Sequence, residues 1–312
     1  MIEAITFPTT VVRKKVIMKE LYLMCIVACV IFALHTDAYF VPSPTFLRNT
    51  PQQATISDKA DLSVSRLKYD ILQLSAALDR GQSFNPTSGT QYSEKMAYAK
   101  EKIKDLISKS ASLPKSLQEI DGEWELVFSS VPHGIFRSSP FFLAIQEAYS
   151  KAGQPEKAQL FFKLHELQTC SWGLSKIGKV SQIIDSKNGL FISEFDTSIF
   201  SLTVIPFVGW FKLLPTFGGT VVTVSKVNLT DDGILKLEVD YTTSKKIPGL
   251  NGVADFIWDQ KVPVNQIWSL LPWNQGKPPT ATIKIKYSDE DFRIMEDIDG
   301  ETFVYTRPIY VQ

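Results

Sequence analysis

Cysteine and histidine are scarce in this sequence, which limits the chemistry that the chain can carry. It contains three cysteines and three histidines among 312 residues. Cys25 and Cys29 lie in an apolar N-terminal segment, so only Cys170 remains beyond it. A single cysteine forms no internal disulfide, which argues against a disulfide-stabilised secreted domain. His133 and His165 belong to no cluster with the spacing of metal ligands, so no metal site is predicted.

The sequence also lacks recognisable catalytic and cofactor-binding motifs. It contains no G-x-S-x-G nucleophile turn, no P-loop and no dinucleotide-binding fingerprint. Acidic groups such as Asp231-Asp232 and Asp289-Glu290-Asp291 fall at predicted turns, where we interpret them as solvated turn residues. We therefore predict no catalytic residue and no cofactor. No nucleic-acid partner is indicated, because acidic side chains slightly outnumber basic ones after residue 57.

The N-terminal segment has the features of a secretory signal. The apolar run from Leu21 to Leu34 has 14 uncharged residues, whereas about 20 are needed to span a bilayer. Basic residues precede this run, and the small residues Thr36 and Ala38 follow it at the positions that a signal peptidase recognises. We predict a cleavable signal peptide over residues 1–38. A short membrane anchor is the alternative, and Met18 is an alternative start.

Residues 39–57 are predicted to form the second half of a two-part address. This stretch contains no acidic residue, one arginine, three prolines and many hydroxyl or amide side chains, a composition typical of transit peptides. Its first residues, Tyr39-Phe40, resemble the aromatic junction of presequences that reach a complex plastid through the endoplasmic reticulum. The scarcity of cysteine fits delivery to a plastid better than secretion. We therefore expect a plastid location.

The remainder of the chain alternates between helical and strand periodicity. Apolar residues at helical spacing predict helices over Asp61–Arg80 and around Tyr92–Leu106, with Gly81 as a helix cap. A second helical region is predicted over Phe141–Lys151 and Glu156–Leu167. The segments with strand periodicity and hairpin turns are Glu123–Ser129, Lys179–Asp185, Leu190–Phe195, Thr220–Leu229, Ile234–Thr242, Thr280–Tyr287, Asp291–Met295 and Thr302–Arg307. About eight short strands predict an antiparallel barrel or sandwich.

Such a barrel can enclose a hydrophobic ligand or hold a packed core, and the sequence is compatible with both. The side chains expected to point inward are Trp124, Phe128, Phe191, Phe195, Leu237, Tyr241, Ile283 and Ile285. The segment Val204–Phe217 has one charge and four aromatic residues. It could dip into a lipid surface, although burial between strands is the simpler interpretation.

Several segments, in order, resemble the plastid lipid-associated proteins, also called plant fibrillins. Ile120–Ser130 (IDGEWELVFSS) is similar to the hallmark strand of that family, and Leu78–Gly81 (LDRG) to the end of its first helix. Tyr287–Ile294 (YSDEDFRI), followed by Phe303-Val304, is similar to its late strands. Arg137–Phe142 (RSSPFF) resembles a subgroup with an inserted helix pair. The resemblance extends from Arg66 to Arg307, whereas Ser201–Trp273 matches no family pattern.

The resemblance implies an α+β, mostly β fold: a lipocalin-like antiparallel β-barrel preceded by a helix pair, with an inserted helical segment, over residues 61–310. It implies a non-enzymatic protein that binds or organises carotenoids, quinones or acyl lipids at thylakoids or plastoglobules, as a peripheral membrane or lipid-particle protein. Asp289, Asp291 and Arg293 belong to a family hallmark and are expected to form hydrogen bonds that close the barrel, or a polar contact to a ligand. The expected ligand-binding residues are Trp124, Phe128, Phe195, Tyr241, Ile283 and Arg293.

Two other functions are compatible with the sequence. The first is an enzyme of isoprenoid or lipid metabolism on the same barrel, using a buried carboxylate such as Glu194 or Asp240. The second is a scaffold that docks a plastid partner through the helices of Phe141–Leu167.

Overall fold

A computed structural model describes most of the chain after the predicted address. The described residues are 56–82, 89–109, 113–131, 136–169, 175–199, 204–205, 211–212, 217–245, 260–269 and 277–310. The predicted signal peptide, nearly all of the transit-like segment, His133 and Cys170 lie outside these ranges, and so does most of Val204–Phe217. Among the described residues, no helix is long and apolar enough to cross a membrane.

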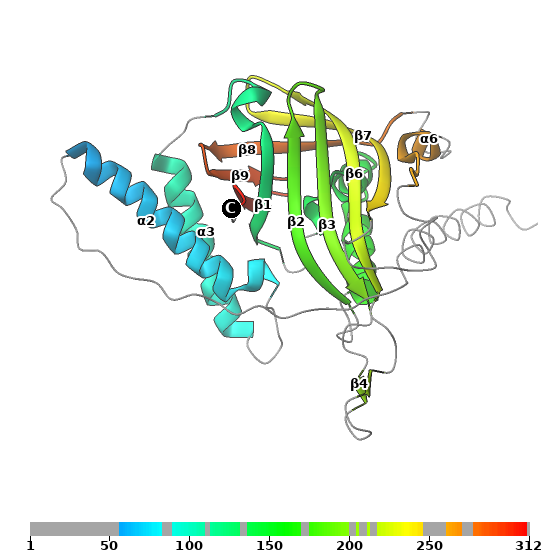
Figure 1. The fold of residues 1–312 in the computed structure, drawn as a ribbon, viewed down its shortest axis with the longest axis horizontal. Helices are drawn as coiled ribbons and strands as arrows, with labels where there is room; N and C mark the ends of the chain where they lie inside the picture. The colour runs from blue at the N-terminus through cyan, green and yellow to red at the C-terminus, as the bar shows by residue number, and fades with distance from the viewer. Residues whose placement is uncertain are drawn as a thin grey trace, which may run out of the picture.

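The centre of the structure is a closed antiparallel barrel (Figure 1). Its eight strands follow the order β1-β10-β9-β8-β7-β6-β3-β2 around the barrel. The strands are β1 (Gly122–Ser129), β2 (Ser175–Asp185), β3 (Leu190–Ile199), β6 (Phe217–Leu229), β7 (Ile234–Lys245), β8 (Thr280–Ser288), β9 (Phe292–Glu296) and β10 (Thr302–Thr306). The prediction of a mostly β fold with a lipocalin-like barrel is therefore confirmed. Two further strands, β4 (Val204–Ile205) and β5 (Phe211–Lys212), pair only with each other.

The barrel wall is buried on both faces where it meets the N-terminal helices. Inside the barrel, a cluster that includes Trp124, Leu126 and Phe303 forms the main core. Outside, Phe128 and Val304 pack with the helices in a second cluster. Successive residues of a strand point to opposite faces. A strand that is covered by the core on one face and by the helices on the other therefore has few positions for polar side chains.

Helices α2 (Ile56–Ala77) and α3 (Gly89–Lys109) form the predicted helix pair and lie against the barrel beside β1 and β9 (Figure 1). Their inward stripe consists of Leu67, Ile71, Leu78, Tyr92, Met96, Ala99, Ile103 and Leu106. It covers Phe128, Tyr287, Phe292, Ile294 and Val304 on the outer barrel wall. Each large apolar side chain buried here contributes about 1.5–3 kcal/mol, so this contact fixes the helix pair to the barrel.

A tight turn, η1 (Asp79–Gly81), follows α2 and lies against the end of β1. Asp79 and Arg80 both have positive φ, and Gly81 has a φ of +90°. A Cβ on Gly81 would lie 2.0 Å from the backbone oxygen of Ser129. Arg80 Nη1 donates to the carbonyl of Gly178 on β2 over 2.6 Å. The turn is therefore shaped for direct contact between backbones, which explains a glycine at this position.

Lys68 on α2 connects the helix pair to the β8–β9 turn. Its Nζ lies 2.7 Å from Asp289 Oδ2 and 2.6 Å from Asp291 Oδ1. Burial alone would raise the pKa of Asp289, but hydrogen bonds from Lys68 and Tyr287 and the charge of Lys68 lower it on balance. Asp289 Oδ1 also accepts the backbone N–H of Phe292 over 2.9 Å. These two hallmark aspartates therefore fix the turn and attach α2 to it.

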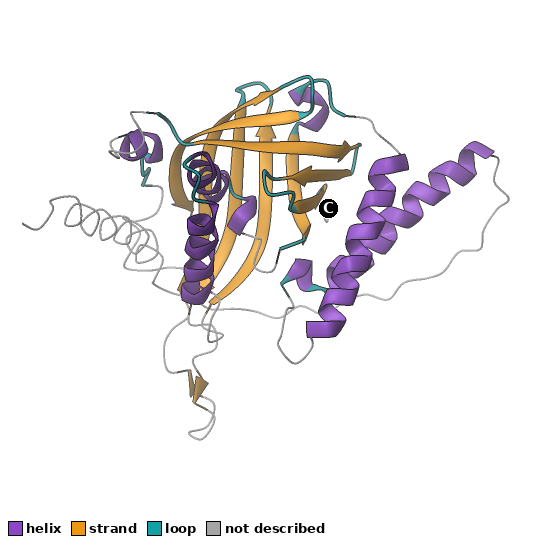
Figure 2. Cartoon of the chain, turned by 180° about the vertical axis from the view of Figure 1, so that it is seen from behind, coloured by secondary structure: helices purple, strands orange, loops and turns teal. Residues whose placement is uncertain are grey.

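The inserted helices α4 (Pro140–Lys151) and α5 (Pro155–Thr169) lie on a different side of the barrel from α2 and α3 (Figure 2). Pro140 occupies the first turn of α4, where its missing N–H costs no hydrogen bond. Phe142, Leu143 and Ala144 belong to the same cluster as the barrel interior. The insert therefore covers apolar residues of the barrel. A short helix, α6 (Val264–Ser269), and the 3-10 turns η2 (Leu117–Ile120) and η3 (Phe136–Ser138) complete the described elements.

Replacing Gly81 with alanine should strongly destabilise the protein. The new Cβ would clash with the Ser129 carbonyl and would hold an unfavourable φ, so we expect a loss of at least about 3 kcal/mol. Gly153→Ala is the matched control, because Gly153 has a φ of +68° but no atom within 4 Å of an added Cβ. The control should lose only about 1 kcal/mol. Urea denaturation measures the free energy of unfolding of both variants. Equal losses of stability would contradict the close backbone contact at Gly81.

Lys68→Met should destabilise the protein by about 1–2 kcal/mol at neutral pH, because it leaves Asp289 without its cation. The native pKa of Asp289 is lowered, so its stabilising contribution exists above its ordinary pKa and disappears as the pH falls through the native value. The pKa of Lys68 is raised, so its contribution disappears as the pH rises through that raised value. The difference from the unmodified chain should therefore be largest between about pH 5 and 9.

The control is Lys95→Met, at an exposed position of α3. It should leave the urea midpoint nearly unchanged across the same pH range. A Lys68→Met difference that persisted undiminished at pH 2 would show that the ion pair is not its cause.

Candidate functional site

A row of polar side chains crosses the otherwise apolar interior of the barrel. Four residues on neighbouring strands pair directly: Gln182 with Ser193, Ser193 with Thr223, and Thr223 with Thr242. Gln182, Ser193 and Thr223 are at most 2% exposed. The Oγ1 atoms of Thr223 and Thr242 lie 3.4 Å apart. A packed core rarely places so many hydroxyl and amide groups together.

The rest of the interior is apolar and aromatic. Trp124, Phe195 and Ile283, three of the predicted ligand-binding residues, all belong to the interior cluster. Phe191, Leu237 and Ile285 also belong to it, as predicted. The structure therefore places these six inward-facing candidates together around the polar row.

Two of the predicted ligand-binding residues do not face the interior. Phe128 belongs to the outer cluster under the helix pair, because a bulge between Leu126 and Phe128 shifts the alternation by one residue. Tyr241 pairs with Val224, which alternates with the inward-facing Thr223. The register shift between Tyr241 and Val239 therefore turns Tyr241 to the outer face, where Lys261 Nζ lies 4.6 Å from the centre of its ring.

Arg293, the sixth predicted ligand-binding residue, lies inside the barrel and is 0% exposed. Its guanidinium carbon is 4.6 Å from the Trp124 ring centre and 5.1 Å from that of Tyr305. Its Nη2 donates to Gln182 Oε1 over 2.7 Å. Burial lowers the pKa of Arg293 to about 9, because removal from water disfavours the charge.

Gln182 and Tyr305 hold this arginine in place. Gln182 Nε2 donates to the Tyr305 hydroxyl over 2.7 Å and to the Ser138 carbonyl over 3.2 Å. Trp124 Nε1 donates to the Ile120 carbonyl over 2.9 Å, which fixes the plane of the indole. Burial raises the pKa of Tyr305, so its hydroxyl stays neutral at physiological pH.

Several buried polar atoms on this interior face have no hydrogen-bond partner among the described residues. They include Ser193 Oγ, Ser225 Oγ, and both Nε and Nη1 of Arg293. Each such atom costs about 1–3 kcal/mol when it is buried without a partner. The interior therefore offers hydrogen-bonding capacity that the described side chains do not satisfy.

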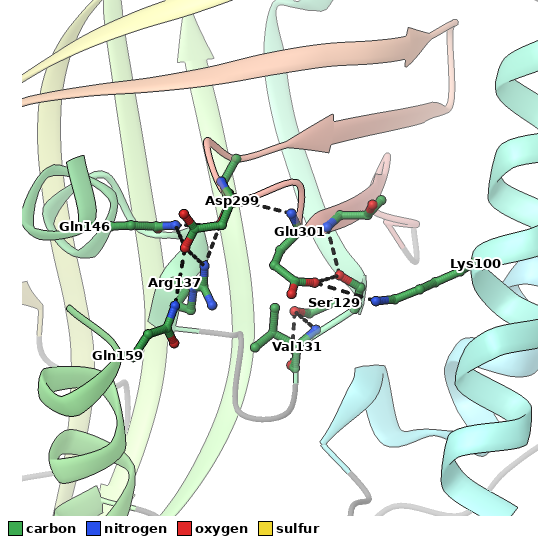
Figure 3. Close-up of polar contacts among 11 residues, drawn as sticks. Lys100, Ser129, Val131, Arg137, Gln146, Gln159, Asp299 and Glu301 are labelled. Carbon is green, nitrogen blue, oxygen red and sulfur yellow. Dashed lines mark hydrogen bonds and ion pairs between the residues drawn. The ribbon is translucent and has the colours of Figure 1, made fainter. Parts of the chain in front are cut away.

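The β9–β10 turn connects the barrel to both helical pairs (Figure 3). On one side, Asp299 Oδ2 accepts hydrogen bonds from Gln146 Nε2 over 2.6 Å and from Arg137 Nη2 over 3.3 Å. On the other side, Glu301 Oε2 accepts from Ser130 Oγ over 2.5 Å and lies 3.7 Å from Lys100 Nζ on α3. This turn therefore anchors the insert beside the barrel interior.

Sequence reasoning missed the polar row. Its signal was present, because Gln182 alternates with Val180 and Ile184 in the apolar phase of β2, and Ser193 alternates with Phe191 and Phe195 on β3. A polar residue in the inward phase of a strand indicates an interior hydrogen-bonding group. The closed order of the strands then brings these positions side by side.

The two carboxylates of the enzymatic hypothesis, Glu194 and Asp240, are only partly buried, and both make polar contacts. Glu194 alternates with the inward-facing Ser193 and Phe195 and therefore points outward, where it binds Lys245. Asp240 accepts a hydrogen bond from Asn265 Nδ2 over 2.8 Å. In the described part of the chain, no group of three or more His, Cys, Asp or Glu residues could hold a metal. For the scaffold hypothesis, the apolar face of α4 is buried against the barrel, whereas Leu160 on α5 is 58% exposed.

Comparison with known proteins agrees with this architecture. The family model PAP_fibrillin matches residues 65–306, a range that includes most of α2, all of α3 to α5 and all the barrel strands. Comparisons with curated proteins and with solved structures give no match. Because the family model covers most of the chain, the protein belongs to the PAP/fibrillin family of plastid lipid-associated proteins.

Proposed function

We propose that the barrel binds a hydrophobic or amphipathic plastid metabolite in its interior, so that the protein carries or organises such molecules at thylakoids or plastoglobules. Carotenoids, quinones and acyl lipids are the candidate classes. The family is associated with plastids and lipids, which supports this general role. The predicted two-part N-terminal address favours delivery to a complex plastid through the endoplasmic reticulum.

One observation carries the proposal: the polar row and the nearby Ser225 place unpartnered hydroxyls inside an apolar closed barrel. Ser193 Oγ and Ser225 Oγ are buried without a partner among the described residues. A packed core would bury apolar atoms at these positions, since unpaired hydroxyls destabilise the fold. A ligand with a long apolar body and one polar group fits this mixture of surfaces.

The first test is native mass spectrometry of the protein isolated from its own plastids, together with flotation of plastid lipid particles. A lipid, quinone or carotenoid should co-purify, and the protein should float with the particles. Isolation without any such molecule, together with failure to float, would contradict the proposal.

A Ser193→Leu variant distinguishes a ligand cavity from a packed core. In a barrel that holds a ligand, the added side chain fills the cavity, so binding of oleyl alcohol should weaken at least about tenfold while the free protein keeps its stability. In a packed core the same change would destabilise the free protein by about 1–3 kcal/mol. Isothermal titration and urea denaturation of the full chain measure the two effects.

The control is Thr280→Leu, at an exposed position that pairs with Glu238 on the outer barrel wall. It adds a similar apolar side chain to β8 and should change neither quantity. Failure of the unmodified full chain to bind oleyl alcohol would contradict interior binding directly.

A further inference from the structure

The environment of Arg293 differs from that of the other deeply buried arginine. Arg137 is 5% exposed and donates to Asp297 over 2.8 Å and to Asp299 over 3.3 Å, so its charge is balanced by two carboxylates. Arg293 is 0% exposed, yet its only hydrogen-bond acceptor among the described residues is the neutral amide of Gln182. An isolated buried charge is far more costly than a paired one.

The aromatic neighbours stabilise this cation only in part. Trp124 and Tyr305 lie within cation–π distance of the Arg293 guanidinium. Aromatic faces, however, accept none of the N–H groups in the guanidinium plane. Nε and Nη1 keep no acceptor among the described residues. The site therefore presents a positively charged hydrogen-bond donor between two aromatic walls.

The surroundings of Arg293 also indicate the chemistry of its partner. Trp124 and Tyr305 belong to a buried apolar cluster that also includes Phe191, Phe195 and Ile283. A guanidinium binds carboxylate and phosphate oxygens through short, charge-assisted hydrogen bonds. An aliphatic chain attached to such a group would be stabilised by burying its methylenes against these apolar side chains.

We propose that Arg293 binds the anionic head group of a single-chain amphiphile whose tail occupies the barrel interior. Gln182 orients the guanidinium, and Trp124 and Tyr305 hold its plane. The ligand supplies the negative charge that the described residues do not provide. This inference rests on the proposed interior binding and narrows it to an anionic ligand.

The test compares three ligands with the same tail: oleate, oleyl phosphate and oleyl alcohol. Titrated into the delipidated full chain, at least one of the two anions should bind about tenfold or more tightly than the alcohol. Whichever anion binds more tightly identifies the head group as a carboxylate or a phosphate.

Arg293→Gln should abolish the preference for the anion while oleyl alcohol still binds. The matched control is Arg307→Gln, because Arg307 also stacks on Trp124, at 3.8 Å, but donates to the backbone carbonyls of Asp121 and Glu123. That control should keep the preference. A preference that survives in Arg293→Gln would overturn the inference.

Gln182→Glu provides a second test that does not require removal of the arginine. The new carboxylate would lie beside Arg293 Nη2 and neutralise its charge, so the variant should show no preference for anions while oleyl alcohol still binds. A preference at the level of the unmodified chain in this variant would also overturn the inference.

Binding of oleyl alcohol distinguishes failure of the head-group inference from failure of interior binding. If the unmodified chain binds all three ligands equally, the head-group inference is wrong and interior binding stands. If it binds none of them, interior binding itself is wrong.

Discussion

The architecture depends on burying one part of the barrel wall from both sides. β1, β8, β9 and β10 face the barrel core on one side and the α2–α3 pair on the other. Neither contact is optional, because strands that are apolar on both faces would otherwise expose a large hydrophobic surface. The backbone contact at Gly81, the Lys68 ion pairs and the β9–β10 turn all reinforce this arrangement. The helix pair is therefore an integral layer of the domain.

The same part of the barrel wall lies between the α2–α3 pair and the candidate site. β9 places Phe292 and Ile294 against the helices, and Arg293 and Met295 toward the interior. The family hallmark segment Tyr287–Ile294 thus contributes to both the helix contact and the barrel interior. Its aspartates attach the helix pair, whereas its arginine lies beside Trp124 and Tyr305 in the core. One short strand can contact both the helices and the interior because its side chains alternate between the two faces of the barrel wall.

The sequence predicted the fold more fully than the site. Helical and strand spacing placed both helix pairs and all the barrel strands, and the order of motifs indicated the family. The interior positions of Trp124, Phe195, Ile283 and Arg293 agree with the prediction. Phe128 and Tyr241 were wrongly expected inside, because a bulge adds one residue to a strand and leaves no mark in hydrophobic periodicity. The polar row depends on which strands are neighbours, which strand spacing alone does not specify.

Gln182 has a consequence for the electrostatics of the barrel interior. Its amide connects Arg293, Tyr305 and Ser138 without contributing charge, so the interior keeps a net positive group. A glutamine codon becomes a glutamate codon through one base change, and that change would cancel the charge within an unchanged barrel. The electrostatic character of the interior is thus one mutational step from neutrality.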